Sequence, residues 1–122
     1  MAGKQRLQYF ILRYAPNPLS DANAAICVVL YDPTSIEAGF CKVGFKPGWK
    51  SDILKLGPDA DIQVIEATVR DLDHQLTNPE TRRQVLEFAL GAFSNALRIS
   101  EPKECLSQNP TQTLNDLVTR LV

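Results

Sequence analysis

Histidine and cysteine, the usual zinc ligands and frequent catalytic residues, are scarce in this sequence. Its 122 residues include one histidine, His74, and three cysteines, Cys27, Cys41 and Cys105. At about 100° per residue, His74 falls opposite the apolar stripe of its expected helix, which predicts an exposed side chain. Its spacing from the cysteines fits no zinc-binding pattern. We therefore expect neither a metal centre nor a histidine-based triad.

The sequence also lacks the glycine motifs of phosphate-binding loops and of nucleophile elbows. Cys41, beside Lys42, is the one thiol with a positive neighbour along the chain, and Cys27 is typical of a small core residue. No catalytic constellation is visible. We therefore predict a protein that is not an enzyme and has no cofactor.

Excess charge and long apolar runs are absent as well. The formal net charge is −1 and the isoelectric point is about 5.8, a balance that disfavours a general polyanion binder or a membrane-surface protein. No apolar stretch approaches the roughly 20 residues that cross a bilayer, and no signal peptide is expected. Three widely spaced cysteines suit a reducing compartment. The expected location is the cytoplasm, without membrane contact.

The most distinctive stretch that is present is the apolar run Ala24–Tyr31. It is apolar at odd and even positions alike, so both of its sides are expected to be covered, as in the central strand of a sheet. Gln8–Ala15 is predicted to be the first strand, ended by Pro16. The turn pattern Asp32-Pro33-Thr34-Ser35 predicts an antiparallel return strand over Ile36–Phe45.

This turn places Cys27 opposite Phe40, and we favour that register. A one-residue bulge would instead bring Cys27 opposite Cys41.

Apolar residues at steps of three and four predict an amphipathic helix over Asp61–Leu76. Asn78-Pro79 and Asn109-Pro110 each place an N-cap residue before a proline, which predicts one helix ending near Phe93 and another reaching the C-terminus. We also expect a short helix, a strand and an extended connection, over Lys50–Leu56, Ala96–Ser100 and Glu101–Ser107.

These elements predict a single α+β domain over residues 1–122, with residues 1–6 as a short flexible tail. Its antiparallel sheet is expected to have three to four strands, a meander plus one later strand. The helices are expected to pack on one face of this sheet.

Lysines and aromatic residues alternate after the return strand, and the candidate interaction surface consists of Lys42, Phe45, Lys46, Trp49 and Lys50. Positive charge beside a stacking ring suits single-stranded nucleic acid. Aromatic anchors suit a protein interface equally well. In a third interpretation, the two aromatic residues close the core and the lysines are merely solvated. We expect Trp49 to be partly exposed.

Three residues of the first strand are candidate structural or functional residues: Tyr9, Arg13 and Tyr14. Alternation places Tyr9 and Arg13 on one face and Tyr14 on the other. If the face of Arg13 is covered, its guanidinium needs a carboxylate or carbonyl partner, because an unpaired buried charge is costly.

Three segments together resemble the bacterial domain-of-unknown-function 3037 family. They are the stretches Tyr9–Pro16, Val28–Pro33 and Leu97–Ser100, the last of them followed by Asn109-Pro110 and a terminal Leu-Val helix. The family pattern has Asn, an apolar residue and Gly before the Val-Val-Leu strand, where this chain has Ala25-Ile26-Cys27.

The resemblance implies a small cytoplasmic prokaryotic protein with no established activity, whose gene often lies beside one for a HipA-like kinase. We therefore expect a non-enzymatic protein-interaction module, an accessory or antitoxin-like partner of such a kinase. The alternative is a single-stranded nucleic-acid-binding protein that uses the Lys/Trp surface.

Overall fold

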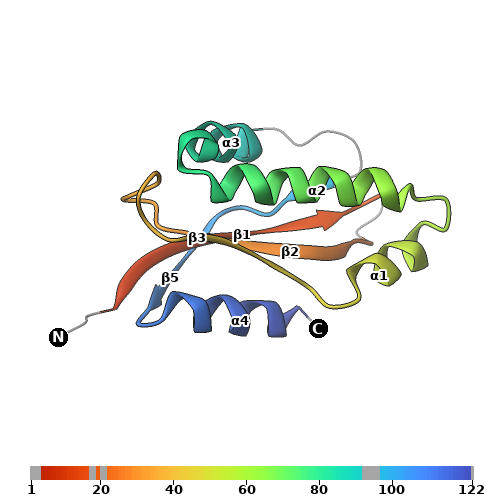
Figure 1. Ribbon diagram of the computed structural model, residues 1–122. Coiled ribbons are helices and arrows are strands. Elements are labelled where there is room, and N and C mark those ends of the chain that lie inside the picture. Colours follow the sequence, from red (N-terminus) through yellow and green to blue (C-terminus); the bar gives the residue numbers. More distant parts are fainter. Residues whose placement is uncertain (1–3, 17–18, 20–21, 92–96, 122) are drawn as a thin grey trace.

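The computed structural model describes residues 4–16, 19, 22–91 and 97–121, with the backbone alone for residues 87–91. It contains an antiparallel sheet with helices on both of its faces (Figure 1). The strand order is β3-β2-β1-β4, and β5 also pairs with β1. The strands are β1 (Gln5–Tyr14), β2 (Ala24–Tyr31), β3 (Cys41–Phe45), β4 (Leu97–Ile99) and β5 (Lys103–Ser107). The α+β class and the β1-β2-β3 meander are confirmed.

Strand β2 behaves as its composition predicts, since all eight of its residues are buried. Its side chains join two separate apolar clusters. Val29 lies in a cluster with Phe10, whereas Val28 lies in another with Leu7 and Leu114. Both sides of β2 are therefore covered.

The four helices are α1 (Trp49–Leu56), α2 (Ile62–Thr77), α3 (Pro79–Gly91) and α4 (Pro110–Arg120). Three of the predicted helix starts are capped by side chains, and at one of them the Asn78 side chain accepts a hydrogen bond from the Glu80 amide at 3.0 Å. The Asp61 carboxylate accepts a hydrogen bond from the Val64 amide at 3.1 Å, and the Asn109 side chain accepts one from the Gln112 amide at 3.2 Å. No helix of the described residues is long and apolar enough to cross a membrane.

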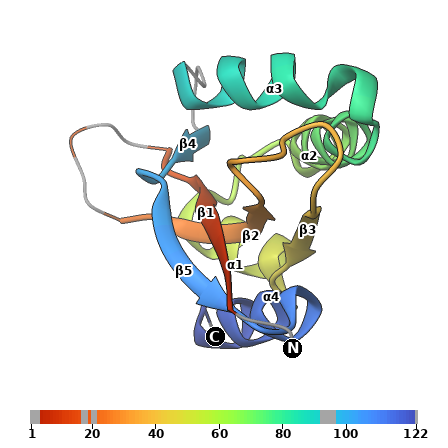
Figure 2. The same ribbon diagram turned by 90° about the vertical axis from the view of Figure 1, so that its left-hand side faces the viewer.

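The arrangement of the helices differs from the expected one. Helices α2 and α3 lie over one face of the sheet, and α4 lies under the other (Figures 1 and 2). The expectation that helices pack on one face only is therefore wrong. The second face is itself apolar, because Leu7, Val28 and Leu30 project from it, and Leu114 of α4 covers them.

The outer partner of β1 is divided between two short strands. Strand β4 pairs with Leu12–Tyr14, and β5 pairs with Gln5–Tyr9. Between them, the Ser100 amide donates to the Ile11 carbonyl at 3.0 Å, and the Ser100 Oγ accepts from the Ile11 amide at 2.8 Å. Most of the segment expected to be a plain extended connection is therefore a strand. Its pairing also extends β1 back to Gln5, so residues 5 and 6 of the expected tail belong to this strand.

Strand β3 is shorter than expected and has a different register. It begins at Cys41, and residues 33–40 form a loop that closes where the Asp32 amide donates to the Phe40 carbonyl at 2.9 Å. Cys27 lies opposite Phe45, and Cys41 lies opposite Tyr31. The expected Cys27–Phe40 pairing is therefore wrong, whereas the expectation that the two thiols are not opposite each other is confirmed.

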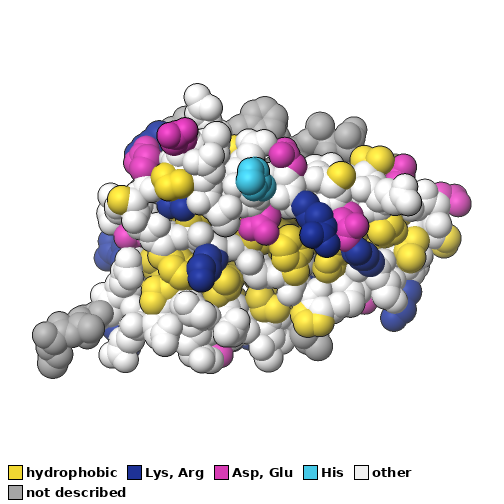
Figure 3. Space-filling model, viewed as in Figure 1, with side chains coloured by type: hydrophobic (Ala, Val, Ile, Leu, Met, Phe, Trp, Pro, Cys, Tyr) yellow, Lys and Arg dark blue, Asp and Glu magenta, His cyan; other side chains and the backbone are white. Residues whose placement is uncertain are grey.

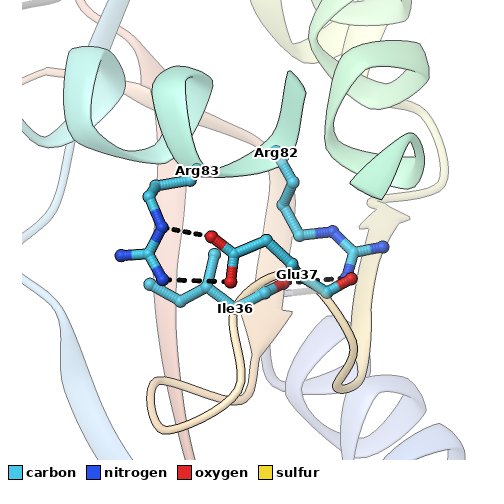
Figure 4. Close-up of polar contacts among 4 residues, drawn as sticks. All are labelled: Ile36, Glu37, Arg82 and Arg83. Atoms are coloured by element: carbon cyan, nitrogen blue, oxygen red, sulfur yellow. Dashed lines mark hydrogen bonds and ion pairs between the residues drawn. The ribbon is translucent and has the colours of Figure 1, made fainter. Parts of the chain in front are cut away.

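Helix α3 holds this loop in place through two consecutive arginines (Figure 4). The buried Arg82 donates from Nε to the Leu76 carbonyl at 2.7 Å, and from Nη1 to the carbonyls of Ile36 and Gly39 at 2.9 and 3.0 Å. The exposed Arg83 forms a two-point ion pair with Glu37. Hydrogen bonds from Arg82 thus replace the strand pairing that residues 36–39 lack.

Asp32 fixes the other end of the loop. Its buried carboxylate accepts hydrogen bonds from the Thr34 amide at 2.9 Å, the Thr34 hydroxyl at 2.7 Å and the Gln5 side chain at 3.0 Å. Burial by itself would raise the pKa of Asp32, but these bonds outweigh burial and hold the pKa below the ordinary value of 3.8.

A lowered carboxyl pKa predicts acid sensitivity of the fold. The contribution of Asp32 to stability is complete above its unfolded pKa and is lost as the pH falls through its folded value, below 3.8. Asp32→Asn should flatten the decline in unfolding free energy below about pH 4, measured by urea unfolding across a pH series. Thr34→Ala, which keeps the amide donor, should move that decline to higher pH. An identical pH profile for all three proteins would refute this role of Asp32.

Candidate functional site

A pocket of about 310 Å³ opens between the end of β3, helix α1 and helix α2. We call it the aromatic pocket. Its lining residues are Phe45, Trp49, Lys50, Glu66, Val69, Arg70 and Asp73. Its volume lies at the lower end of the range of small-ligand sites.

Two aromatic rings contribute to the aromatic pocket. The ring centroids of Phe45 and Trp49 are 6.4 Å apart, and the Lys50 ammonium lies 5.7 Å from the Trp49 ring. Only 9% of Trp49 is exposed, and it belongs to the core cluster on the α2 side of the sheet. The expectation of partial exposure is therefore wrong. The Pro47-Gly48 turn, with Gly48 at φ 78°, directs the chain back so that α1 lays Trp49 against the sheet.

The charged groups of the aromatic pocket largely neutralise one another. Glu66 pairs with Lys50 and with Arg70, and the hydrogen bond from Lys50 is the main reason why the pKa of Glu66 is lowered. Asp73 has no such direct pair among the described residues. Burial raises its pKa, while the nearby positive charges of His74 and Arg70 act in the opposite direction.

The buried thiols are poor candidates for nucleophiles. Burial, reinforced by the negative charge of Asp73, raises the pKa of Cys27 to about 12. Burial also raises the pKa of Cys41 to about 11, with Arg82 opposing and Asp73 reinforcing the shift. Both thiols are therefore protonated near neutral pH, whereas a cysteine nucleophile acts as a thiolate.

A second cavity, of about 390 Å³, lies at the same end of the sheet as the aromatic pocket, but on the other face. We call it the basic cleft. Four of its lining residues are basic and one is acidic: Arg13, Lys46, Lys55, Arg120 and Asp52. Lys46 pairs with Asp52, and the hydrogen bond from Lys46 is the main cause of the lowered pKa of Asp52.

The structure divides the candidate interaction surface between these places. Phe45, Trp49 and Lys50 line the aromatic pocket, and Lys46 lines the basic cleft. Lys42 is exposed on β3, with its ammonium 6.0 Å from the Phe40 ring.

The three candidate residues of β1 lie in three different surroundings. Tyr9 packs against the cluster beneath α4, and Tyr14 is buried in the cluster beneath α2. Arg13 lines the basic cleft, where its Nη1 donates to the Asn23 side-chain oxygen at 3.0 Å. Its partner is thus an amide oxygen and not a carboxylate.

Sequence reasoning missed the acidic and basic residues that α2 contributes to the aromatic pocket. Glu66, Arg70 and Asp73 follow one another at steps of four and three, so they form a stripe beside Val69. This spacing was a visible signal. The exposed His74 lies outside the pocket, and the described residues contain no group of three or more His, Cys, Asp or Glu side chains that could hold a metal ion.

Strand β3 forms one edge of the sheet. The Asp32 amide bonds to the Phe40 carbonyl and the Lys46 amide bonds to the Ile26 carbonyl, which fixes the alternation of the β2–β3 ladder. Residues 42 and 44 therefore bond to β2, and the backbone groups of Cys41, Val43 and Phe45 point outward. Among the described residues, none supplies a backbone partner for these three.

This edge faces the viewer in Figure 3, where hydrophobic side chains form a band across the middle of the molecule, with basic side chains among them. Partly buried residues of this region come from three elements: Val43 and Phe45 of β3, Glu66 of α2 and Val118 of α4. A sheet edge with apolar flanks is typical of a surface that binds another chain.

The fold and this edge define a small α+β domain built on an antiparallel sheet. The chain belongs to the family described as "Protein of unknown function (DUF3037)", which it matches over residues 9–122. A search of curated proteins and a search of solved structures each gave no match.

Proposed function

We propose that this protein is a non-enzymatic interaction module and that a protein partner binds along the edge of β3, beside the aromatic pocket. The observation that supports this proposal is the row of outward-facing backbone groups at Cys41, Val43 and Phe45. An extended segment of a partner can add to such an edge as a further strand. Backbone hydrogen bonds then supply affinity, and side-chain pockets supply specificity.

The opposite edge of the sheet is less suited to strand addition. It is divided between β4 and β5, and Pro102 between them has no amide hydrogen. Lys103 and Glu104 of β5 are exposed. Short strands, proline and charged side chains are features that discourage pairing at an edge. The edge formed by β3 is therefore better suited to strand addition than the edge formed by β4 and β5.

The aromatic pocket provides a specificity element next to β3. Phe45 and Val69 form an apolar floor, and Glu66 and Arg70 lie around it. An apolar centre with a polar rim is common in protein interfaces. A partner segment paired with β3 could place one apolar side chain in this pocket.

The family resemblance favours a HipA-like kinase as the partner, with this protein as its accessory or antitoxin-like subunit. The competing proposal, nucleic-acid binding through the Lys/Trp surface, has weaker support. Lys46 and Lys50 are paired with carboxylates and Trp49 is buried, so little free charge and little exposed indole surface remain there.

A proline substitution tests strand addition at β3. Val43→Pro removes an outward-facing amide hydrogen and leaves the bonds of Lys42 and Gly44 to β2 intact. After co-expression with a HipA-like kinase, we expect the parent protein to co-elute with the kinase in size-exclusion chromatography. Val43→Pro should weaken the complex by about tenfold or more, because a strand bond is lost and the proline ring obstructs approach.

Val43→Ala is the matched control, because it also shortens the side chain but keeps the amide hydrogen. It should bind nearly as well as the parent. Equal binding by the proline and alanine variants would contradict strand addition, and separate elution of the parent protein and the kinase at micromolar concentrations would contradict this partner. Binding of the parent protein to short single-stranded oligonucleotides at low salt would favour the nucleic-acid alternative.

A further inference from the structure

The basic cleft exists because α4 is too short to cover its face of the sheet. An 11-residue helix spans about 16 Å, whereas the 10-residue strand β1 spans about 33 Å. Helix α4 begins beside β5, where Thr113 contacts Ser107. It ends at Arg120, and in Figure 1 this end lies near α1. The sheet around Arg13 is left beyond the helix.

Small side chains keep this space open. Ala24 and Ala25 at the start of β2 form part of the cleft wall, together with Leu56 of α1 and Leu121. Each alanine offers a single methyl group where a larger residue would fill the cavity. The cleft thus combines an apolar wall with polar groups, as small-molecule sites do.

The cleft carries more positive than negative side chains. Four basic side chains converge from β1, α1, α4 and the segment after β3, and Lys46 alone among them has an ion pair among the described residues. Within the described part of the chain, Arg13 is partly buried and its guanidinium makes an exposed hydrogen bond to a neutral amide oxygen, that of Asn23. Several positive side chains around one cavity repel one another, and this repulsion is unfavourable for the free protein.

A neighbouring position adds to this imbalance. Arg13 lies directly opposite Arg98 of β4, and cross-strand partners project from the same face of a sheet. Like charges in this relation destabilise strand pairing. The local arrangement therefore lowers stability, and a bound anion would relieve it.

We propose that the basic cleft binds a small molecule that carries a phosphate group. Arginine offers planar pairs of N–H donors that match phosphate oxygens, and lysine adds flexible point charges. Four positive side chains suit the charge of a phosphate better than the single charge of a simple carboxylate. The apolar wall would contact the organic part of the molecule. Its volume of about 390 Å³ lies in the range of small-molecule sites, which favours a small molecule over a polymer.

Titration calorimetry of the full chain tests this site. Inorganic phosphate and pyrophosphate are the probes, acetate is the carboxylate comparison, and potassium chloride keeps the ionic strength constant. We expect saturable one-to-one binding of at least one phosphate probe with a Kd of about 1 mM or lower, and weaker binding of acetate. Absence of saturation by either phosphate probe up to about 10 mM would overturn the proposal.

Variants locate the binding. Arg13→Gln and Lys55→Gln should each raise the Kd by about tenfold, because each removes a charged donor. Asp52→Asn should lower the Kd, because it removes the acidic side chain of the cleft. Lys103→Gln, at an exposed position of β5, is the matched charge control and should leave the Kd unchanged.

If Arg13→Gln does not fold, the exposed Lys55 still provides the test. Equal effects of Lys55→Gln and Lys103→Gln would show that binding depends on overall charge, and would overturn the assignment to this cleft. Acetate binding as tight as that of the phosphate probes would overturn the ligand class.

Discussion

Replacement of Trp49 by alanine should lower the free energy of unfolding by about 3–5 kcal/mol. Trp49 is 9% exposed and packs against Phe45, with ring centroids 6.4 Å apart. Its removal would leave a cavity between α1, the sheet and α2, and the surrounding side chains could fill this cavity only in part. Urea unfolding at equilibrium, monitored by far-ultraviolet circular dichroism, measures the effect without relying on the lost indole fluorescence.

Leu54→Ala is the matched control on the same helix. Leu54 is 43% exposed, so its truncation should cost about 1 kcal/mol or less. A loss below about 1 kcal/mol for Trp49→Ala would contradict its core role and would restore the interpretation of Trp49 as a binding anchor. If the loss of stability is large, weaker partner binding by Trp49→Ala can result from the damaged fold. Such weaker binding would then not identify Trp49 as a contact residue.

Elements with strong local signals were predictable from the sequence. The uniform apolarity of β2 required cover on both sides, and the pairs Asn78-Pro79 and Asn109-Pro110 marked helix starts that the structure confirms. In each case the residues that determine the structure lie within one segment. Periodicity and capping therefore suffice for such elements.

Features that depend on distant contacts were not predictable in this way. The apolarity of β2 implied that both faces of the sheet need cover. The periodicity of α4 shows an apolar stripe, but it does not show which of the two faces α4 covers. Strand β5 has weak strand character of its own and is defined by pairing with β1. The β2–β3 register depends on a loop whose structure is set by Arg82, far along the chain.

The candidate sites, too, were predictable only where their residues are close together in the sequence. The sequence pointed to Lys42–Lys50 as a surface of interest, and part of it does line the aromatic pocket. It could not show that Lys46 belongs with Arg13 and Arg120 in the basic cleft, since these residues meet only through the sheet and the end of α4. Nor could it show that Lys50 is paired with Glu66 of α2.

Replacement of Arg82 by alanine should lower the free energy of unfolding by roughly 3 kcal/mol or more, through loss of the loop between β2 and β3. Arg82 is 6% exposed and donates to three backbone carbonyls at 2.7 to 3.0 Å, those of Leu76, Ile36 and Gly39. A buried carbonyl that loses its donor costs about 1–3 kcal/mol. Part of that cost will be avoided, because the loop can move and expose Ile36 and Gly39 to water.

Arg83→Ala is the matched control, because Arg83 is the next residue of the same helix and contacts the same loop. Its ion pair with Glu37 is exposed on both sides, so its loss should have a much smaller effect on stability. Urea unfolding gives the two stability changes, and amide hydrogen exchange at Gly39, which donates to the Ser35 carbonyl at 2.7 Å, reports on the loop itself. We expect faster exchange there in Arg82→Ala than in Arg83→Ala. Arg82→Lys should be intermediate, because lysine keeps the charge but cannot reach all three carbonyls with fixed geometry. Equal stability losses for the two alanine variants, with unchanged exchange at Gly39, would refute the role assigned to Arg82.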